Sequence, residues 1–266
     1  MFLLAALGWL LTWRWAASRI GCSASAIFLL GIWVALLSSS YEWALLRRIG
    51  FVAHYLKSGG FLARWLVRRA LLLTWIAVKN LPVALILFTA TLSLSGAEWL
   101  VLAADLLLLL LVLGAMERLF DHEAVDLYVR PLARIWAHRI NAAALWAALV
   151  AVNFYTPHPN YIGISLAGVV DTAAAHVDCG CDVVATLGRV DAVGQSIAWW
   201  AAENFLSSLT GSVERHAAWL VFLATFGISL LVAWSYSRAL IGVLARPWHI
   251  EPLSVAYDAN YKEKSA

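Results

Sequence analysis

A single carboxyl group interrupts the most apolar stretch of this chain. Asp105 is the only ionisable side chain in residues 99–116, WLVLAADLLLLLLVLGAM. A carboxylate surrounded by lipid is costly, so such groups commonly face the interior of a helical bundle and mark proton or ion pathways. Lys79 is a second charged group beside an apolar run. Because no second titratable group lies next to Asp105 in the sequence, structural pairing with Thr89 or Thr91 is favoured over proton transfer.

The densest group of metal-binding residue types is the segment 176–182, HVDCGCD. Two thiolates with a histidine and carboxylates are ligands for zinc or for a softer ion such as Cu(I). However, the Cys-x-Cys spacing is not that of common structural zinc sites. A disulfide between Cys22 and one cysteine of this pair, or a set of reduced thiols, is therefore favoured over a metal. The residues concerned are His176, Asp178, Cys179, Cys181 and Cys22.

Acidic and histidine side chains also follow the central apolar run. They are Asp121, His122, Glu123, Asp126 and, further along, His138. The H-E-x-x-H spacing of a zinc protease is absent, so a solvated, salt-bridged connector is the favoured interpretation. The sequence also lacks a P-loop, G-x-S-x-G and a dinucleotide fingerprint. These patterns favour a protein that is not an enzyme, and they identify no cofactor.

The composition indicates that lipid is the solvent for most of the chain. Of its 266 residues, 63% are hydrophobic and 13% charged, and 15 are Trp. A soluble domain carries about 25% charged residues. The net charge of +3 is too small to indicate nucleic acid as a partner. We expect an all-α, polytopic integral membrane protein whose first partner is the lipid bilayer.

Six membrane spans are predicted from the apolar segments of one membrane domain. They cover residues 2–18, 24–46, 81–95, 99–116, 141–154 and 217–236. A five-span alternative leaves 2–18 as a helix lying in the interface, because that segment is short. A break at Asn80, before Pro82, is expected to separate an interfacial amphipathic helix over 61–78 from the next span. Ser95 and Gly96 predict a tight turn that makes residues 81–116 a helical hairpin.

The distribution of Lys and Arg predicts the orientation of the spans. Basic residues gather in segments 47–79 and 117–139 and in the tail 238–266, which the positive-inside rule places in the cytoplasm. A new helical turn is expected to start at Pro131. Region 156–215 then lies outside, and the expected location is a bacterial inner membrane with a cytoplasmic C-terminus. The basic residues expected at the membrane interface include Arg64, Arg68, Arg69, Arg130 and Arg134.

The favoured function is that of a non-enzymatic subunit of a larger envelope complex for secretion, conjugation or transport. It depends on the sparse polar chemistry within the spans, on the alanine-rich segment 141–152 and on the Trp-rich amphipathic stretch 195–208. Other membrane subunits are the expected partners. One alternative is a small transporter or channel subunit that uses Asp105. Another is a membrane redox or metal protein that uses Cys179 and Cys181.

Overall fold

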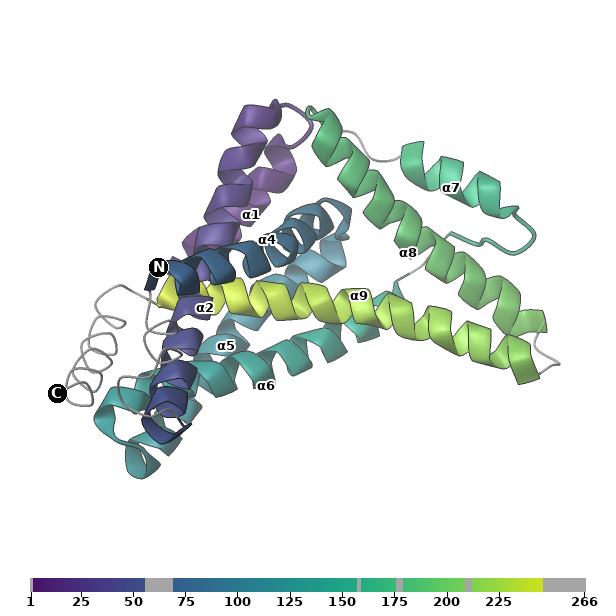
Figure 1. Cartoon of the computed structure of the whole chain (residues 1–266). Helices are drawn as coiled ribbons and strands as arrows, with labels where there is room; N and C mark the ends of the chain where they lie inside the picture. The colour runs from purple at the N-terminus through teal and green to yellow at the C-terminus, as the bar shows by residue number, and fades with distance from the viewer. Residues whose placement is uncertain (1, 56–68, 157–158, 176–178, 209–211, 246–266) are drawn as a thin grey trace.

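The structure is a computed structural model that describes residues 2–55, 69–156, 159–175, 179–208 and 212–245. These residues form helices joined by short loops, with no strand among them (Figure 1). The all-α class predicted from the sequence is confirmed for this part of the chain. The helices are α1 (Phe2–Ala16), α2 (Cys22–Tyr55), α4 (Arg69–Ser93), α5 (Gly96–Glu123), α6 (Asp126–Tyr155), α7 (Leu166–Ala175), α8 (Asp182–Ser208) and α9 (Ser212–Leu244).

Among the described residues, four helices are long and apolar enough to cross a membrane. The candidate spans are Cys22–Arg48 in α2, Ala70–Ser93 in α4, Gly96–Glu123 in α5 and Tyr128–Tyr155 in α6. Each overlaps one of the spans predicted from the sequence. The remaining apolar helices of the described chain, α1 and the Ser229–Leu244 part of α9 among them, are shorter. The chain is therefore a multi-helix protein suited to a membrane, with four helices of spanning length.

The predicted tight turn between α4 and α5 is present, and a capping box forms it. The Ser95 hydroxyl accepts a hydrogen bond from the Glu98 amide at 3.3 Å, and the Glu98 carboxylate accepts one from the Ser95 amide at 2.7 Å. These two bonds satisfy amides that would otherwise be unpaired at the start of α5. However, α5 packs mainly along α6, and α4 packs mainly along α2. The turn therefore joins two helix pairs, and the prediction of a simple hairpin is wrong.

Two predicted helix breaks are also wrong. Helix α4 runs without interruption through Asn80 and Pro82, and α6 runs through Pro131. A proline removes one backbone hydrogen bond, and a long apolar helix packed against its neighbours tolerates that loss. Arg64 and Arg68, from the predicted interfacial helix, lie outside the described residues, and Arg69 is the first residue of α4.

Helix α9 passes through the bundle and packs against α2, α4, α6 and α8 (Figure 1). The apolar core lies where α9 meets α1, α2, α4 and α5. Its largest buried side chains include Trp13, Phe88 and Tyr236, and Trp13 stacks on Phe88 with ring centroids 4.1 Å apart. Gly242 of α9 contacts the Ala35 carbonyl of α2, where a Cβ atom would not fit. Glycine at this position lets the two helix backbones approach closely.

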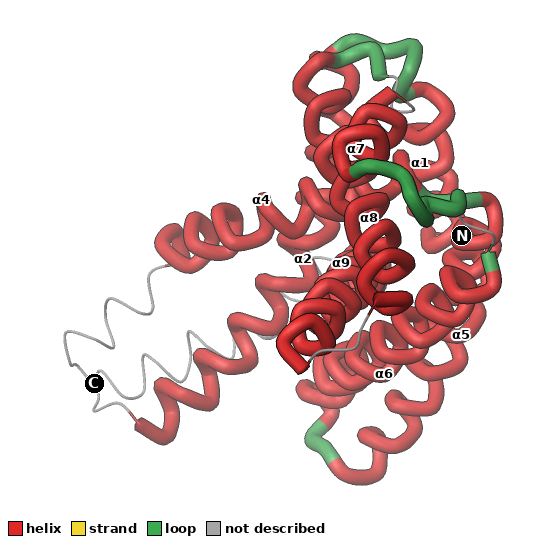
Figure 2. The backbone as a smooth tube through the Cα atoms, turned by 90° about the vertical axis from the view of Figure 1, so that its right-hand side faces the viewer, coloured by secondary structure: helices red, strands yellow, loops and turns green. Residues whose placement is uncertain are grey.

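Helices α7 and α8 lie across one side of the bundle and are called the cap below. Figure 2 looks onto this side, with α7, α8 and the start of α9 toward the viewer. Near the end of α8, Glu203 accepts a hydrogen bond from the Tyr161 amide at 2.6 Å, and Asn204 donates one to the Tyr161 carbonyl at 3.1 Å. Region 156–215, predicted as an outer loop region, is therefore mostly helical where the structure describes it.

Candidate functional site

Asp105 is buried inside the bundle and has a partner on the following helix. Its side chain is 4% exposed, and the Asn141 side-chain amide donates a hydrogen bond to its Oδ2 atom at 2.9 Å. Thr89 and Thr91, the predicted partners, instead donate to carbonyl groups of their own helix. That prediction of pairing is wrong, because α5 packs along α6.

Two further side chains extend this contact. The Asn141 amide also lies 3.3 Å from Ser237 Oγ on α9, and Ser237 Oγ lies 3.3 Å from His138 Nδ1 on α6. His138 is 1% exposed, and Ser237 is completely buried. The prediction that His138 belongs to a solvated connector is therefore wrong. Asp105, Asn141, Ser237 and His138 are called the polar chain below.

Three buried atoms of the polar chain have no hydrogen-bond partner among the described residues. They are Asp105 Oδ1, Asn141 Oδ1 and His138 Nε2. More than nine in ten buried polar groups in folded proteins are paired with protein or with ordered water, so each exception calls for an explanation. An amide oxygen can accept a further hydrogen bond, whereas a carboxylate and an imidazole can also take up a proton.

Aromatic side chains surround the His138 end of the polar chain. The His138 ring makes edge contacts with Trp43 and Trp234, at centroid distances of 5.7 and 4.2 Å. Near Asp105, the Tyr236 hydroxyl donates a hydrogen bond to the Leu102 carbonyl at 2.8 Å. Large rings lower the local dielectric constant, and charge interactions are stronger in such an environment.

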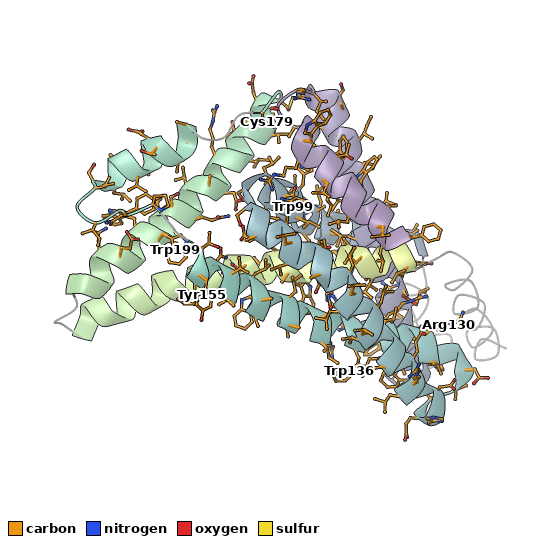
Figure 3. All side chains as sticks on the ribbon, turned by 180° about the vertical axis from the view of Figure 1, so that it is seen from behind. Trp99, Arg130, Trp136, Tyr155, Cys179 and Trp199 are labelled. Atoms are coloured by element: carbon orange, nitrogen blue, oxygen red, sulfur yellow. A yellow bond between two sulfur atoms is a disulfide. The ribbon has the colours of Figure 1, made fainter. Side chains whose placement is uncertain are left out.

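A buried ion pair lies further along the same face of α6. Arg134 Nη1 is 2.7 Å from Glu42 Oε1 on α2, and the two side chains are 5% and 1% exposed. Arg134, His138 and Asn141 are four and three residues apart, so they share one helix face and span about 10 Å along the axis. Arg134 was predicted at the membrane interface among the basic residues, and its side chain turns inward to Glu42. Arg130 is exposed (Figure 3).

A third polar contact connects α9, α2 and α4. Arg238 Nη2 donates a hydrogen bond to Ser40 Oγ at 2.8 Å, and Ser40 Oγ lies 3.0 Å from Asn80 Oδ1. Asn80 was predicted to end a helix and is instead a buried residue inside α4. Lys79 is exposed, and the described contacts do not join it to Asp105.

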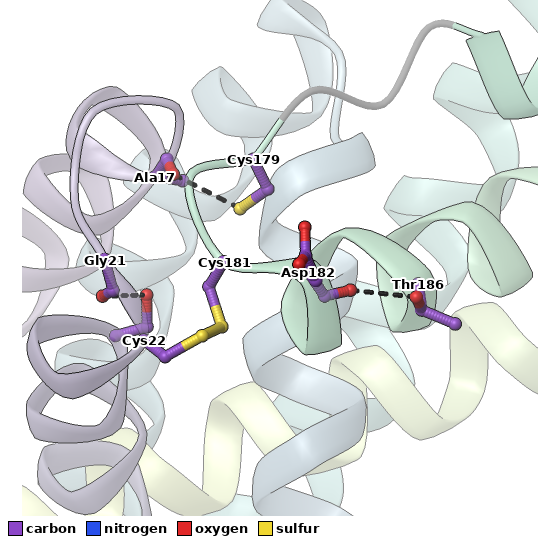
Figure 4. Close-up of a disulfide and its surroundings, with 8 residues drawn as sticks. Ala17, Gly21, Cys22, Cys179, Cys181, Asp182 and Thr186 are labelled. Carbon is purple, nitrogen blue, oxygen red and sulfur yellow. Dashed lines mark hydrogen bonds between the residues drawn. A yellow bond between two sulfur atoms is a disulfide. The ribbon is translucent and has the colours of Figure 1, made fainter.

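Cys22 and Cys181 form a disulfide that connects the start of α2 to the start of α8 (Figure 4). The Cys179 thiol donates a hydrogen bond to the Ala17 carbonyl at 3.2 Å, and the Gly180 amide donates to the same oxygen at 2.9 Å. With two of the three sulfur atoms in a disulfide, their thiolates are not available to a metal. His176 and Asp178, the other predicted ligands, lie outside the described residues.

One acidic group of the cap is bound to the bundle. The Ser93 hydroxyl of α4 donates a hydrogen bond to Asp191 Oδ2 on α8 at 2.8 Å, and the Gln195 amide donates to the same atom at 3.2 Å. Burial raises the pKa of Asp191, the two hydrogen bonds offset part of that rise, and the negative charge of Glu98 adds to it. Asp191 therefore connects the middle of α8 to the end of α4.

Most members of these clusters were not predicted from the sequence. Arg134, His138 and Asn141 have the spacing of one helix face, which was the available signal. The prediction of a solvated connector up to Arg139 does not assign these residues to a packed helix face. Glu42 and Ser237 each lie beside other polar residues, and the sequence contains no comparable signal for their partners.

Comparisons of this chain with protein-family models, curated proteins and solved structures find no match.

Proposed function

We propose that this chain is a membrane transporter or channel subunit that moves protons, with Asp105 binding and releasing the proton inside the bundle. The observation that carries the proposal is the geometry around Asn141. Its amide holds one Asp105 oxygen and the Ser237 hydroxyl, and Ser237 also contacts His138. On sequence grounds, Asp105 was an isolated carboxylate. In the bundle it shares a hydrogen-bonded chain with a second titratable side chain, as expected for an intramembrane proton pathway.

The buried atoms of the polar chain that have no described partner favour proton transfer over a purely structural role. Asp105 Oδ1 and His138 Nε2 are buried and have no partner among the described residues. A proton bound at Asp105 neutralises a charge in a low-dielectric environment. Binding and release of this proton therefore change the interactions along the polar chain. Asn141 and Ser237 orient the two titratable groups, and ordered water bound to the unpaired atoms would complete the path.

The proposed orientation turns the His138 end of the polar chain, with the Glu42–Arg134 ion pair beyond it, toward the cytoplasm. Basic residues gather at that end, including Arg47, Arg130 and Arg139. The opposite side carries the cap and the Cys22–Cys181 disulfide, and disulfides persist in oxidising compartments. We further propose six spans, formed by α1 and α9 with the four longer helices, a cytoplasmic C-terminus and a bacterial inner membrane. The five-span alternative leaves α1 in the interface.

Proton flux into proteoliposomes tests this function. Purified protein is reconstituted, a potassium gradient with valinomycin sets the membrane potential, and a trapped pH dye reports flux. Asp105→Asn should abolish flux because the amide cannot carry a proton. Asp121→Asn is the matched control, since it makes the same change at an exposed position of the same helix and should leave flux unchanged.

Two further variants separate transfer from folding. Asp105→Glu keeps a titratable group and should retain part of the flux, whereas His138→Gln should slow it. Gel filtration and helical content establish that each variant is folded before flux is compared. Undiminished flux through folded Asp105→Asn protein would overturn the proposal.

Assembly into a larger envelope complex is the second candidate. It is favoured by Ala143, Ala147 and Ala151, which are exposed at four-residue intervals on α6, whereas Ala142 is buried within the bundle. Small exposed residues at this spacing let a helix of another subunit approach closely. Extraction in mild detergent followed by mass spectrometry decides this role. A stable set of other membrane proteins supports it, and a lone monomer contradicts it.

A further inference from the structure

Three arginine side chains from different helices surround one tryptophan ring. The guanidinium carbons of Arg47 (α2), Arg139 (α6) and Arg238 (α9) lie 5.5, 5.7 and 5.7 Å from the ring centroid of Trp43. Each distance is within the range of cation–π attraction. These four residues are called the arginine–tryptophan cluster below.

The positive charges of this cluster are not neutralised by the described part of the chain. Glu42, the carboxylate nearest to Arg47 in the sequence, is paired with Arg134. No carboxylate of the described residues forms an ion pair with Arg47, Arg139 or Arg238. Arg47 and Arg238 are close enough for their charges to repel each other. Three like charges gathered around one ring favour the binding of an anion beside them.

The cluster lies where three predicted spans end. Arg47, Arg139 and Arg238 each fall within two residues of an end of the spans 24–46, 141–154 and 217–236. In the structure, Arg47 lies one residue before the end of the candidate span Cys22–Arg48, whereas α6 and α9 continue past Arg139 and Arg238. We take the end of α2 as the level of the membrane interface, where lipid phosphate groups lie. Basic pockets between membrane helices on the cytoplasmic side are the usual place for such headgroups.

Apolar side chains next to the cluster are exposed. Trp136 and Ile140 flank Arg139 on α6 and are 44% and 41% exposed. Trp136 projects from the surface of α6 (Figure 3), and the Arg139 guanidinium lies 5.2 Å from its ring centroid. The same surface therefore offers cationic groups for a phosphate and an apolar area for acyl chains.

We propose that the arginine–tryptophan cluster binds the phosphate headgroup of an anionic phospholipid. Guanidinium groups of Arg47, Arg139 and Arg238 donate charge-assisted hydrogen bonds to the phosphate oxygens. The acyl chains lie along Trp136 and Ile140. The adjoining apolar surface selects a lipid over free phosphate, which would need only the cationic groups.

Native mass spectrometry of the full chain in a nonionic detergent tests this site. Phosphatidylglycerol and phosphatidylcholine with identical acyl chains compete for the protein, and the ratio of the two complexes is measured. Wild-type protein should retain phosphatidylglycerol preferentially. Arg139→Gln should lower that preference about fivefold, and Arg47→Gln combined with Arg139→Gln should lower it about 30-fold.

The matched control is Arg19→Gln. Arg19 is an exposed arginine whose guanidinium lies 4.3 Å from the Trp15 ring centroid, outside the cluster. This variant should keep the preference of the wild type. Arg139→Lys keeps the charge and should retain most of the preference. Arg47 and Arg139 are exposed, and gel filtration establishes that their variants are folded.

Several outcomes would overturn the proposal. Equal retention of the two lipids by wild-type protein would exclude headgroup selection. An unchanged preference in the folded double variant would place selection elsewhere. Displacement of phosphatidylglycerol by inorganic phosphate at an equal concentration would identify a free anion as the ligand. Proton flux is not a readout here, so this test does not depend on the proposed function.

Discussion

Glu42 and Arg134 show how single charged residues are accommodated inside this bundle. Both are almost fully buried, and they meet between α2 and α6. Removing two charges from water costs free energy that their attraction repays only when the geometry is good. Such a pair adds little net stability, but the loss of one partner leaves the other charge uncompensated.

We expect Glu42→Gln and Arg134→Gln each to lower the free energy of unfolding by about 3 kcal/mol. The double variant should lose clearly less than the sum, since it leaves no isolated charge. Unfolding in sodium dodecyl sulfate, followed by circular dichroism, measures these differences. Glu123→Gln, at an exposed position of α5, is the control and should change little. Additive losses in the double variant would show that the two groups do not act as a pair.

At the scale of elements, α8 is positioned by three attachments. The disulfide holds its start, Asp191 contacts Ser93 near its middle, and Glu203 and Asn204 bind the Tyr161 backbone near its end. Of these attachments, the contact at Asp191 depends on a carboxyl group with a shifted pKa. The docking of α8 should therefore depend on pH.

The pKa of Asp191 is raised in the folded protein. At pH values between the ordinary pKa and the raised pKa, the folded state therefore binds more protons than the unfolded state. Its ionisation therefore lowers stability as pH rises through that window. We expect Asp191→Asn to raise Tm relative to wild type more at pH 7 than at pH 4. Tryptophan fluorescence during heating measures this difference. An equal rise in Tm at both pH values would show that the charge of Asp191 does not cause the pH dependence.

At the scale of the whole molecule, one disulfide closes most of the chain into a loop. Cys22 and Cys181 are separated by 159 residues, and they connect the start of α2 to the cap. A crosslink between distant residues restricts the unfolded chain, and this effect increases slowly with loop length. The bond also keeps the cap against the end of the bundle.

We expect Cys22→Ser combined with Cys181→Ser to lower the free energy of unfolding by about 2–4 kcal/mol. Treatment of wild-type protein with dithiothreitol should have a similar effect, and a shift in gel mobility reports the loss of the crosslink. Cys179→Ser is the control, because Cys179 is outside the disulfide and should change stability less. Unchanged stability after complete reduction would contradict this role.

The helical class, the presence of apolar helices that overlap four of the predicted spans, and the turn at Ser95 could be predicted from the sequence. Long apolar runs must be helical in lipid because every backbone group needs a partner within its own segment. Ser95 and Glu98 form a capping box from residues only three positions apart. These features depend on local chemistry, so the amino-acid order alone determines them.

The assembly of the candidate site was decided only by tertiary structure. Lipid is as apolar as a protein core, so the apolar residues of a run such as 99–116 contain no signal for the helix that packs against it. The hydrogen-bond partner of Asp105 therefore could not be identified as Asn141, in place of Thr89 or Thr91, without the packing of α5 along α6. The pairing of Cys22 with Cys181 and the gathering of arginines around Trp43 have the same physical reason. Each joins residues far apart in the chain through helix packing, which local sequence patterns do not encode.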